Sequence, residues 1–310
     1  MKLIKRTLIK KPDVTYNLHV ENNHNYVANG MVVSNCHGIR GNVLTNLLNE
    51  HGKHISHRFG CTGTLPKEET DAMAVRVAIG DVRYTIQAHE LITQGYLATL
   101  QIEIIQLEED FMAQYAQFKK DNPTTKTTYV QFVDSYLPDY SAEKSYLQKK
   151  QERLNWMALY IEGKRDLKKG NVLCLVDGVS VGKKLTKLIP GAMFVYGADK
   201  KKVRKEIYDL FKDRNDLIVF ATVQIASTGL DIPRIFNMIG IDLGKSFIRV
   251  VQSIGRGLRK AHDKDSVTFT DICSNLKYGK KHLRERKNIY KEAQYPFKEH
   301  KINYTKDMLL

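Results

Sequence analysis

The stretch NVLCLVDGVSVGKKLTKL, residues 171–188, opens the part of the chain whose pattern decides the fold. It joins an apolar run, Val172–Val176, to a polar helical stretch, and the same alternation is repeated further along the chain. The later apolar runs are Met193–Tyr196, Leu217–Phe220 and Phe236–Ile241. Strands that are apolar throughout are typical of parallel sheets covered by helices on both faces. We therefore predict a parallel α/β sheet, with functional residues in loops at the carboxyl ends of its strands.

The residues before this sheet divide into shorter segments. Residues 13–33 contain two short alternating runs with turn residues between and within them, including Asn29-Gly30. Tyr96–Leu107 alternates as one longer strand, and a helical pattern begins at Asn42. The segment 108–170 is polar, rich in tyrosine and interrupted by proline, as is typical of a connector between domains.

Composition indicates the class of partner and the compartment. The 49 Lys and Arg residues against 34 Asp and Glu give a net charge of +15, which favours a polyanion such as nucleic acid, although a merely soluble protein can also be basic. The four cysteines form no CxxC pair, so we expect a reducing cytoplasm and no metal site built from them. No apolar run approaches the ~18 residues of a membrane span, so we expect no membrane partner.

Gly178–Lys184 has some features of a phosphate-binding loop. It has three residues rather than four between its glycines, and no Ser or Thr follows its first lysine. We interpret it as a glycine-rich turn before a surface helix, so the sequence contains no Walker A motif.

The segment TYNLHVENNHNYVANGMVVSNC, residues 15–36, carries the most specific local pattern. It resembles the terminal blocks of inteins, and the 35 residues from Met1 are similar in length to the C-terminal piece of the split DNA-polymerase inteins. In that family the thiol after the intein attacks an upstream thioester, and the terminal Asn amide nitrogen cyclises onto its own carbonyl and cleaves the peptide. Cys36 and Asn35 match these roles, and His24 matches the proton-shuttling histidine.

One position departs from the intein pattern. Many inteins have His before the terminal Asn, whereas this chain has Ser34, so His24 is expected to carry more of the acid catalysis. The other interpretation of the same residues is an ordinary β-hairpin followed by an unrelated Asn-Cys pair.

The residues after this junction resemble superfamily-two helicases. Cys36-His37 is similar to the second half of an Asp-Glu-Cys-His box, whose acids bind Mg²⁺ and the attacking water, and these acids would then come from another chain. Thr62-Gly63-Thr64, directly after Cys61, resembles motif III, which couples the ATP site to domain closure.

Two further helicase motifs follow in the family's order. ASTGLDIP at residues 226–233 resembles motif V, and QSIGRGLR at residues 252–259 resembles motif VI. Because arginine is always charged and forked, it stabilises charge on a transferring γ-phosphoryl group better than lysine does. The other interpretation of motif VI is a solvated basic helix. The resemblance implies nucleic-acid contacts by Ser227 and Thr228, nucleotide contacts by Gly229, Asp231 and Gly255, and ATP hydrolysis by His37, Gln252, Arg256 and Arg259.

The last part of the chain is strongly basic. Residues 276–310 contain ten Lys or Arg residues against four Asp or Glu. Cations with interleaved aromatic residues can track a nucleic-acid strand and stack on its bases, but a solvated helical appendage would have the same composition. Both interpretations stay open for the interleaved tyrosines, which are Tyr278, Tyr290, Tyr295 and Tyr304.

From Cys36 to about Leu276 the chain resembles the compact DNA helicases of T-even-like phages. The resemblance implies two RecA-like sheets, ATP and Mg²⁺ as cofactors, and unwinding or branch migration of DNA rather than RNA. The fold class is then α/β with a small Hint-type β piece in front. The segments we expect are an intein fragment at 1–35, the end of a first RecA-like domain at 36–107, a helical connector at 108–170, a second RecA-like domain at 171–275 and a basic tail at 276–310.

These inferences predict a precursor in the host cytoplasm that is joined by splicing to a separately encoded N-terminal half. That half would carry the Walker A motif and the intein N-fragment, and this chain alone would lack ATPase activity. The rival prediction is a non-catalytic, basic nucleic-acid-binding module whose first 35 residues are a docking hairpin. A neighbouring reading frame that ends in Asp-Glu fused to an intein N-fragment would favour the precursor.

Overall fold

The computed structural model describes residues 25–28, 31–35, 50, 57–61, 69–165, 170–227, 234–244 and 260–306. The chain divides into two compact units, residues 1–85 and 86–310, and each is built around its own sheet. The short strand expected before residue 25 and the helix expected from Asn42 lie outside the described residues.

In the described residues of unit 1, a three-stranded sheet in the order β1-β2-β3 is followed by helix α2 (Glu69–Ile79). Strands β1 (Asn25–Ala28) and β2 (Met31–Asn35) pair antiparallel with Ala28 opposite Met31, so only Asn29-Gly30 separates them. An Asn-Gly pair is the usual connection of a two-residue hairpin. The turn of this hairpin therefore divides the second predicted run into two strands, and the second of them pairs in parallel with β3 (His57–Cys61).

Unit 2 contains a seven-stranded sheet in the order β10-β4-β9-β8-β5-β7-β6, and every neighbouring pair is parallel. The four predicted apolar runs each form one of its strands, so the predicted parallel α/β sheet is confirmed. The strands are β4 (Thr99–Leu107), β5 (Val172–Val176), β6 (Met193–Val195), β7 (Ile218–Thr222), β8 (Asn237–Ile241), β9 (Ser266–Ser274) and β10 (Phe297–Ile302).

Helices cover both faces of this sheet, as alternate side chains along a strand require. Leu173 and Leu175 of β5 belong to one buried cluster, and Val172, Cys174 and Val176 belong to a second cluster on the opposite face. The first cluster includes residues of α9 (Lys201–Asp213), α10 (Val223–Ser227) and α12 (Lys277–Glu292), whereas the second includes residues of α7 (Gln151–Lys164) and α8 (Val179–Leu188). The short helix α3 (Ala88–Thr93) packs against the edge of the first cluster.

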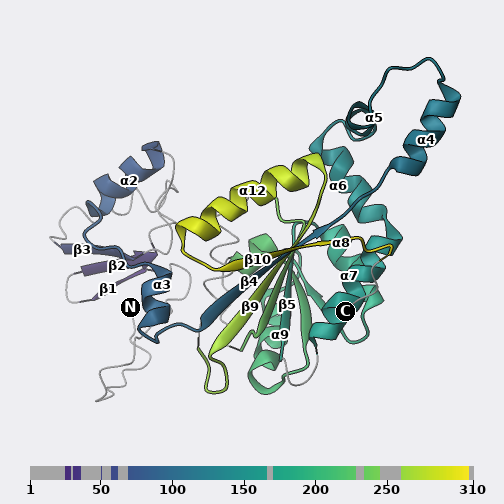
Figure 1. Cartoon of the computed structure of the whole chain (residues 1–310). Helices are drawn as coiled ribbons and strands as arrows, with labels where there is room; N and C mark the ends of the chain where they lie inside the picture. Colours follow the sequence, from purple (N-terminus) through teal and green to yellow (C-terminus); the bar gives the residue numbers. More distant parts are fainter. Residues whose placement is uncertain are drawn as a thin grey trace. The chain divides into compact units, whose positions relative to one another are not determined.

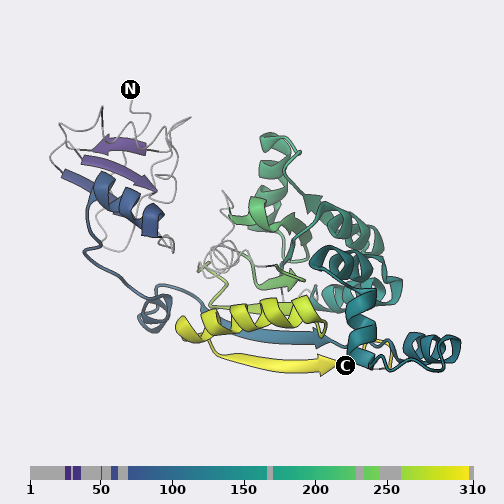
Figure 2. The ribbon, with the colours of Figure 1, turned by 90° about the horizontal axis from the view of Figure 1, so that it is seen from above.

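A third, smaller cluster lies beyond the end of the sheet. Helices α4 (Met112–Asp121), α5 (Tyr129–Tyr136) and α6 (Tyr140–Lys149) enclose the aromatic side chains of Phe111 and Phe132. Helices α4 and α5 extend away from the sheet in both views (Figures 1 and 2).

Two predicted boundaries differ from the structure. Strand β4, expected in the first domain, pairs with β9 and β10 in the sheet of unit 2, and the division between units falls at Thr85. Helix α7, expected in the connector, packs on the sheet through Leu154 and Met157. An apolar pattern shows that a segment is buried but not which sheet buries it, so these boundaries could not be located from the pattern.

The residues expected to form a basic tail are also part of the fold. Strand β10 pairs with β4 at the edge of the sheet, and α12 lies beside these strands (Figures 1 and 2). Tyr290, Tyr295 and Tyr304 are buried, and Tyr278 packs edge-on against Tyr140. The first three tyrosines are therefore core residues and cannot stack on bases.

Candidate functional site

The carboxyl edge of the large sheet is the place where the predicted helicase segments begin. Strand β5 lies between β7 and β8, so the carboxyl ends of these strands are adjacent. Helix α10 follows β7 directly and ends at Ser227, the first predicted nucleic-acid contact. The segment that contains motif VI follows β8. The other residues of both motifs lie outside the described residues, namely Thr228, Gly229, Asp231, Gln252, Gly255, Arg256 and Arg259.

The predicted splicing junction lies at the end of β2 in unit 1. Ser34 and Asn35 are the last two residues of that strand and are paired with Gly60 and Cys61 of β3. Strands β2 and β3 therefore end at the same edge of one parallel pair. His24, Cys36, His37 and Thr62-Gly63-Thr64 lie outside the described residues.

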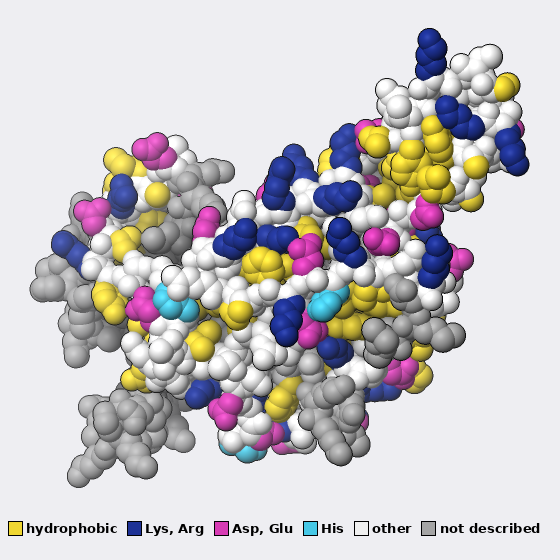
Figure 3. All heavy atoms as spheres, viewed as in Figure 1, with side chains coloured by type: hydrophobic (Ala, Val, Ile, Leu, Met, Phe, Trp, Pro, Cys, Tyr) yellow, Lys and Arg dark blue, Asp and Glu magenta, His cyan; other side chains and the backbone are white. Residues whose placement is uncertain are grey.

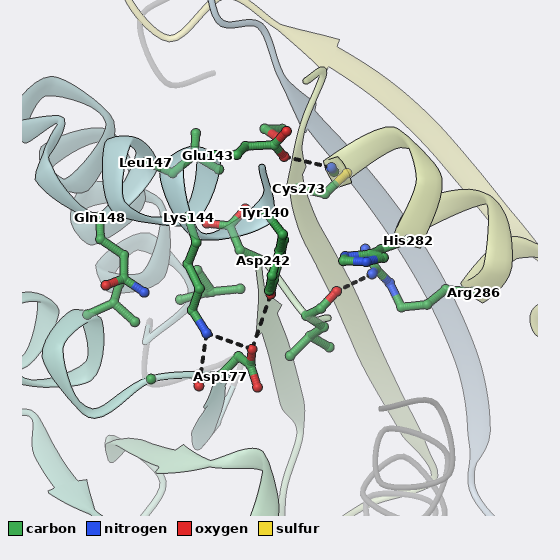
Figure 4. Close-up of a pocket in the computed structure, with 16 residues that line it drawn as sticks. Tyr140, Glu143, Lys144, Leu147, Gln148, Asp177, Asp242, Cys273, His282 and Arg286 are labelled. Carbon is green, nitrogen blue, oxygen red and sulfur yellow. Dashed lines mark hydrogen bonds and ion pairs between the residues drawn. The ribbon is translucent and has the colours of Figure 1, made fainter. Parts of the chain in front are cut away.

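A pocket opens at the carboxyl ends of β5, β8 and β9 in unit 2 (Figure 4). Asp177, Asp242 and Ser274 come from these three strand ends, and residues of α6 and α12 form the remaining walls. His282 of α12 packs edge-on against the ring of Tyr140, with 5.1 Å between the ring centroids. The pocket therefore lies where ligand sites of open α/β sheets are found.

Asp177, at the end of β5, is held by two residues of α6. Its carboxylate accepts a hydrogen bond from Lys144 Nζ at 2.9 Å and one from the Tyr140 hydroxyl at 3.4 Å (Figure 4). Burial, together with the nearby Asp177 carboxylate, raises the pKa of Tyr140 to about 12. Tyr140 therefore acts as a neutral hydrogen-bond donor at neutral pH.

Asp242, at the end of β8, is held by a buried arginine of α7. Arg153 is 1% exposed and donates two hydrogen bonds to the Asp242 carboxylate, at 2.7 and 2.8 Å. Its Nε also lies 3.1 Å from Glu109. Burial alone would lower the pKa of Arg153, but Asp242 and Glu109 outweigh it and the pKa is raised. Asp242 has φ of 45°, a left-handed backbone conformation that Asp tolerates better than most residues.

Glu143 of α6 joins the pocket to the start of α12. Its two carboxylate oxygens accept hydrogen bonds from the backbone N–H groups of Tyr278 and Gly279, at 2.9 and 2.8 Å. An acidic side chain at this place satisfies free N–H groups and complements the helix dipole. Burial raises the pKa of Glu143, although the two backbone hydrogen bonds oppose that rise.

These contacts hold the three carboxylates of the described pocket in place. Each of them has a cation or backbone N–H partner. Among the described residues, no group of three or more His, Cys, Asp or Glu side chains could hold a metal ion. The contacts of the pocket therefore fix the strand ends in position.

Arg234, directly after motif V, ties together the segments around both motifs. Its guanidinium donates to the Asp263 carboxylate at 2.6 and 3.1 Å and to the carbonyl oxygen of Lys212 at 2.6 Å. Its hydrogen bonds hold the pKa of Asp263 below the ordinary value. This ion pair therefore joins the residue directly after motif V in the sequence to a residue four positions after Arg259.

The sequence interpretation missed Arg153, Glu143 and Arg234. For one further contact the sequence did contain a signal. Asp271 is the single charged residue of strand β9, and a buried carboxylate requires a partner. That partner is Arg286 of α12, which donates to Asp271 at 2.7 and 2.9 Å and also to the carbonyl oxygen of Leu243.

Comparison with known proteins agrees with the described sheet. Residues 129–261 match the family model of the helicase conserved C-terminal domain. The chain is 22% identical over 251 residues to putative helicase 22 of Sulfolobus islandicus filamentous virus. The aligned stretch covers 79% of this chain and 42% of that protein. It is 23% identical over 251 residues to the ATP-dependent DNA helicase uvsW of Enterobacteria phage T4, covering 79% of this chain and 46% of that protein.

Solved structures have the same fold. The crystal structure of T4 UvsW has a TM-score of 0.51 at 19% identity and covers 80% of this chain and 48% of that chain. A fragment of a putative HsdR subunit of a type I restriction enzyme from Vibrio vulnificus has a TM-score of 0.60 at 16% identity, covering 91% of this chain and 50% of that chain. The chain thus spans about half the length of these relatives.

No helix of the described residues is long and apolar enough to cross a membrane. The match of residues 129–261 to the helicase conserved C-terminal domain, the similarity to these helicases and the shared fold of the parallel sheet together make the chain similar to the C-terminal part of such proteins.

Proposed function

We propose that this chain is the C-terminal half of a split precursor that is joined to a separately encoded N-terminal half by protein trans-splicing. The ligated product would be an ATP-dependent superfamily-two DNA helicase for unwinding or branch migration. The observation that carries the proposal is the sequence Asn35-Cys36-His37, in which the end of an intein-like hairpin meets the start of a helicase-like region.

The register of unit 1 supports a functional role for this junction. Asn35 is paired with Cys61, so β2 and β3 end at the same edge of one parallel pair. In the sequence, Cys36-His37 and Thr62-Gly63-Thr64, the two segments assigned to one ATP site, come directly after these two strands. Motifs that serve one site are expected to leave a parallel sheet at the same edge.

In the splicing step, the sulfur of Cys36 would attack the carbonyl carbon of a thioester at the end of the N-terminal half. The thiolate of the intein N-fragment would leave, and the acyl chain would then be held on Cys36. The amide nitrogen of Asn35 would next attack its own carbonyl carbon, which forms a cyclic imide and releases the amino group of Cys36. That amino group would take the acyl chain from sulfur and form the peptide bond, while His24 moves protons and Ser34 lies beside the reacting Asn35.

In the joined enzyme, ATP and Mg²⁺ would supply the phosphoryl-transfer chemistry, with the metal-binding acids and Walker A motif coming from the N-terminal half. Arg256 and Arg259 would stabilise charge on the γ-phosphoryl group, with Gln252 and His37 beside them. Gly229, Asp231 and Gly255 would line the nucleotide, Ser227 and Thr228 would contact nucleic-acid phosphate, and Thr62-Gly63-Thr64 would couple the two domains. The Arg234–Asp263 ion pair would keep the motif V and motif VI segments in register.

The test is to mix the chain with an N-terminal fragment that carries a Walker A motif and ends in Asp-Glu fused to an intein N-fragment. Mass spectrometry should detect the ligated product and the released 35-residue piece. Asn35→Ala should leave a branched species, because Cys36 still accepts the acyl chain, whereas Cys36→Ala should prevent the transfer. Full ligation by either variant would show that its assigned role is wrong.

ATP hydrolysis separates the helicase from the rival binding module. We expect no turnover from the chain alone and nucleic-acid-stimulated turnover from the ligated product. A ligated product that binds nucleic acid without any ATP turnover would favour the non-catalytic module.

A further inference from the structure

Helix α12 presents a basic stripe on its outer face. Its 16 residues include seven Lys or Arg and only two Glu. Lys280, Arg284, Lys287 and Lys291 are spaced by four, three and four residues, which places them on one face of a helix. Three of these side chains are exposed and Lys287 is half-buried. We call these four residues the α12 stripe, and Figure 3 shows Lys and Arg side chains gathered over this helix.

The opposite face of α12 is fixed to the sheet. Arg286 forms its two-fold contact with Asp271 of β9, and the Tyr290 hydroxyl donates to the same carboxylate at 2.9 Å. Leu283 and Ile289 are buried in the core cluster. A helix held at several points along its length presents its outer side chains in a fixed row, which lowers the entropy lost when a ligand binds.

The stripe borders a shallow hollow with a polar floor. The hollow is lined by Gln106 of β4 together with Leu283, Asn288 and the α12 stripe. Gln106 is 6% exposed, so its amide forms the floor while the cations form the rim. An amide N–H group with several cations around it suits a phosphate oxygen.

Most of the positive charge of the stripe is uncompensated. Lys287 pairs with Glu299 of β10 at 2.6 Å. Within the described part of the chain, Lys280, Arg284 and Lys291 form no ion pair and no side-chain hydrogen bond. Each unpaired cation is free to replace a counterion on a polyanion, and the released counterions favour binding.

We propose that the α12 stripe binds the phosphodiester backbone of duplex DNA, as a second contact surface of the proposed helicase. From Lys280 to Lys291 the helix rises about 16 Å, the rise of roughly five phosphates along one strand of a duplex. Three of the four tyrosines of this region are buried, and the half-buried Tyr278 packs edge-on against Tyr140, which favours a duplex backbone over an unpaired strand that would need exposed rings to stack on. The inference rests on the proposed function for the identity of the polyanion, but it needs neither splicing nor ATP hydrolysis.

The experiment measures binding of the unspliced chain to a short DNA duplex over a series of salt concentrations. Lys280→Ala with Arg284→Ala should lower affinity about tenfold or more at 0.1 M salt and reduce the salt slope by about 1.8, because each lost phosphate contact removes about 0.9. The reciprocal change, Lys280→Arg with Arg284→Lys, keeps the charges and should retain most of the affinity. Thermal unfolding checks that the variants fold. We expect their unfolding temperatures to stay close to that of the wild type, because both positions are exposed.

The matched control is Lys202→Ala with Lys205→Ala on α9, which removes the same charge from two exposed lysines at the other end of the sheet. We expect a change of less than about threefold in this control, because distant charges are screened at this salt concentration. An equal loss of affinity in the control would show that only net charge matters. The same measurements are made with single-stranded DNA of the same length, and an equal loss of affinity there would show that the stripe does not select a duplex. Either result overturns the proposal. Failure of ligation or ATPase activity with the α12 effect intact would instead count against the proposed function alone.

Discussion

The cations of unit 2 occur in two settings. Arg153, Arg234 and Arg286 are buried, and each forms a two-fold contact with a carboxylate. Lys280, Arg284 and Lys291 are exposed and have no such partner within the described residues. A buried charge must be paired because its desolvation is costly, so its partner fixes its position. An exposed, unpaired charge contributes little to folding and remains available to a ligand.

The largest expected effect concerns Arg256 and Arg259, which we predict to act on substrate rather than on the fold. In the ligated product, Arg259→Ala or Arg256→Ala should reduce ATP turnover roughly 10³–10⁵-fold, because a guanidinium at the γ-phosphate helps most in the transition state. Single-turnover hydrolysis of prebound ATP measures the loss, and unfolding by denaturant should show little change in stability.

Lysine at either position should restore little activity, because it lacks the forked guanidinium. Thr228→Ala is the contrasting variant, since its hydroxyl is assigned to a nucleic-acid phosphate, and it should weaken stimulation by nucleic acid. Near wild-type hydrolysis in both arginine variants would remove motif VI from the mechanism.

The next largest effect is on stability and involves Arg286. Arg286→Met leaves Asp271 buried without its cation, and we expect the free energy of unfolding to fall by about 3–5 kcal/mol. Urea denaturation of the chain measures the change. The control is Arg284→Met, two residues away and exposed, which should change stability by no more than about 0.5 kcal/mol. Equal losses in the two variants would contradict the distinction between buried and exposed cations.

Lys264 gives a pH test of the cost of burying a cation. Burial lowers its pKa to about 8 against the opposing influence of Asp263, whereas the unfolded value is 10.5. Between these values the folded state binds fewer protons than the unfolded state, so this group makes stability rise with pH. Below pH 8 the folded chain bears the cost of the buried charge, at most about 3 kcal/mol.

Denaturation of wild type and Lys264→Met should therefore be compared between pH 7 and pH 10. The stability advantage of the variant should be largest near pH 7 and should shrink as the pH rises, because the wild-type lysine loses its proton in the folded state first. A difference that does not change with pH would contradict the lowered pKa.

The sequence predicted the parts of the fold that are governed by local patterns. The four apolar runs from Val172 to Ile241 became parallel strands; β5, β7 and β8 are buried almost throughout, whereas β6, at the edge of the sheet, is only partly buried. In the sequence Asn29-Gly30 is only an interruption of one run, whereas the structure places the turn of the β1-β2 hairpin there, for which an Asn-Gly pair is well suited. The sheet joined by β4 could not be predicted, since its apolar pattern would suit either unit.

The candidate site divides in the same way. The roles of motifs V and VI stay predictions, and their spacing gave no sign of the nearby contact between Arg234 and Asp263, because these residues are 29 positions apart and meet only in the fold. The basic composition of residues 276–310 was visible, but composition cannot separate the buried Tyr290 and Arg286 from the exposed Lys280. That separation depends on which face of α12 packs on the sheet.

The smallest expected effect involves Lys287, which belongs to both settings because it lies in the α12 stripe and pairs with Glu299. Lys287→Ala should weaken duplex binding less than Lys280→Ala, because Glu299 already acts as its counterion. Glu299→Gln should free Lys287 and strengthen duplex binding by a few fold, with a salt slope steeper by at most about 0.9. Stability should fall by only about 0–1 kcal/mol, as for other partly exposed ion pairs. Glu292→Gln is the control, because it removes the same charge from an exposed position on α12 without freeing a lysine. If Glu292→Gln strengthens binding as much as Glu299→Gln does, Lys287 is not held back by its partner, and pairing does not decide which cations of α12 reach the DNA.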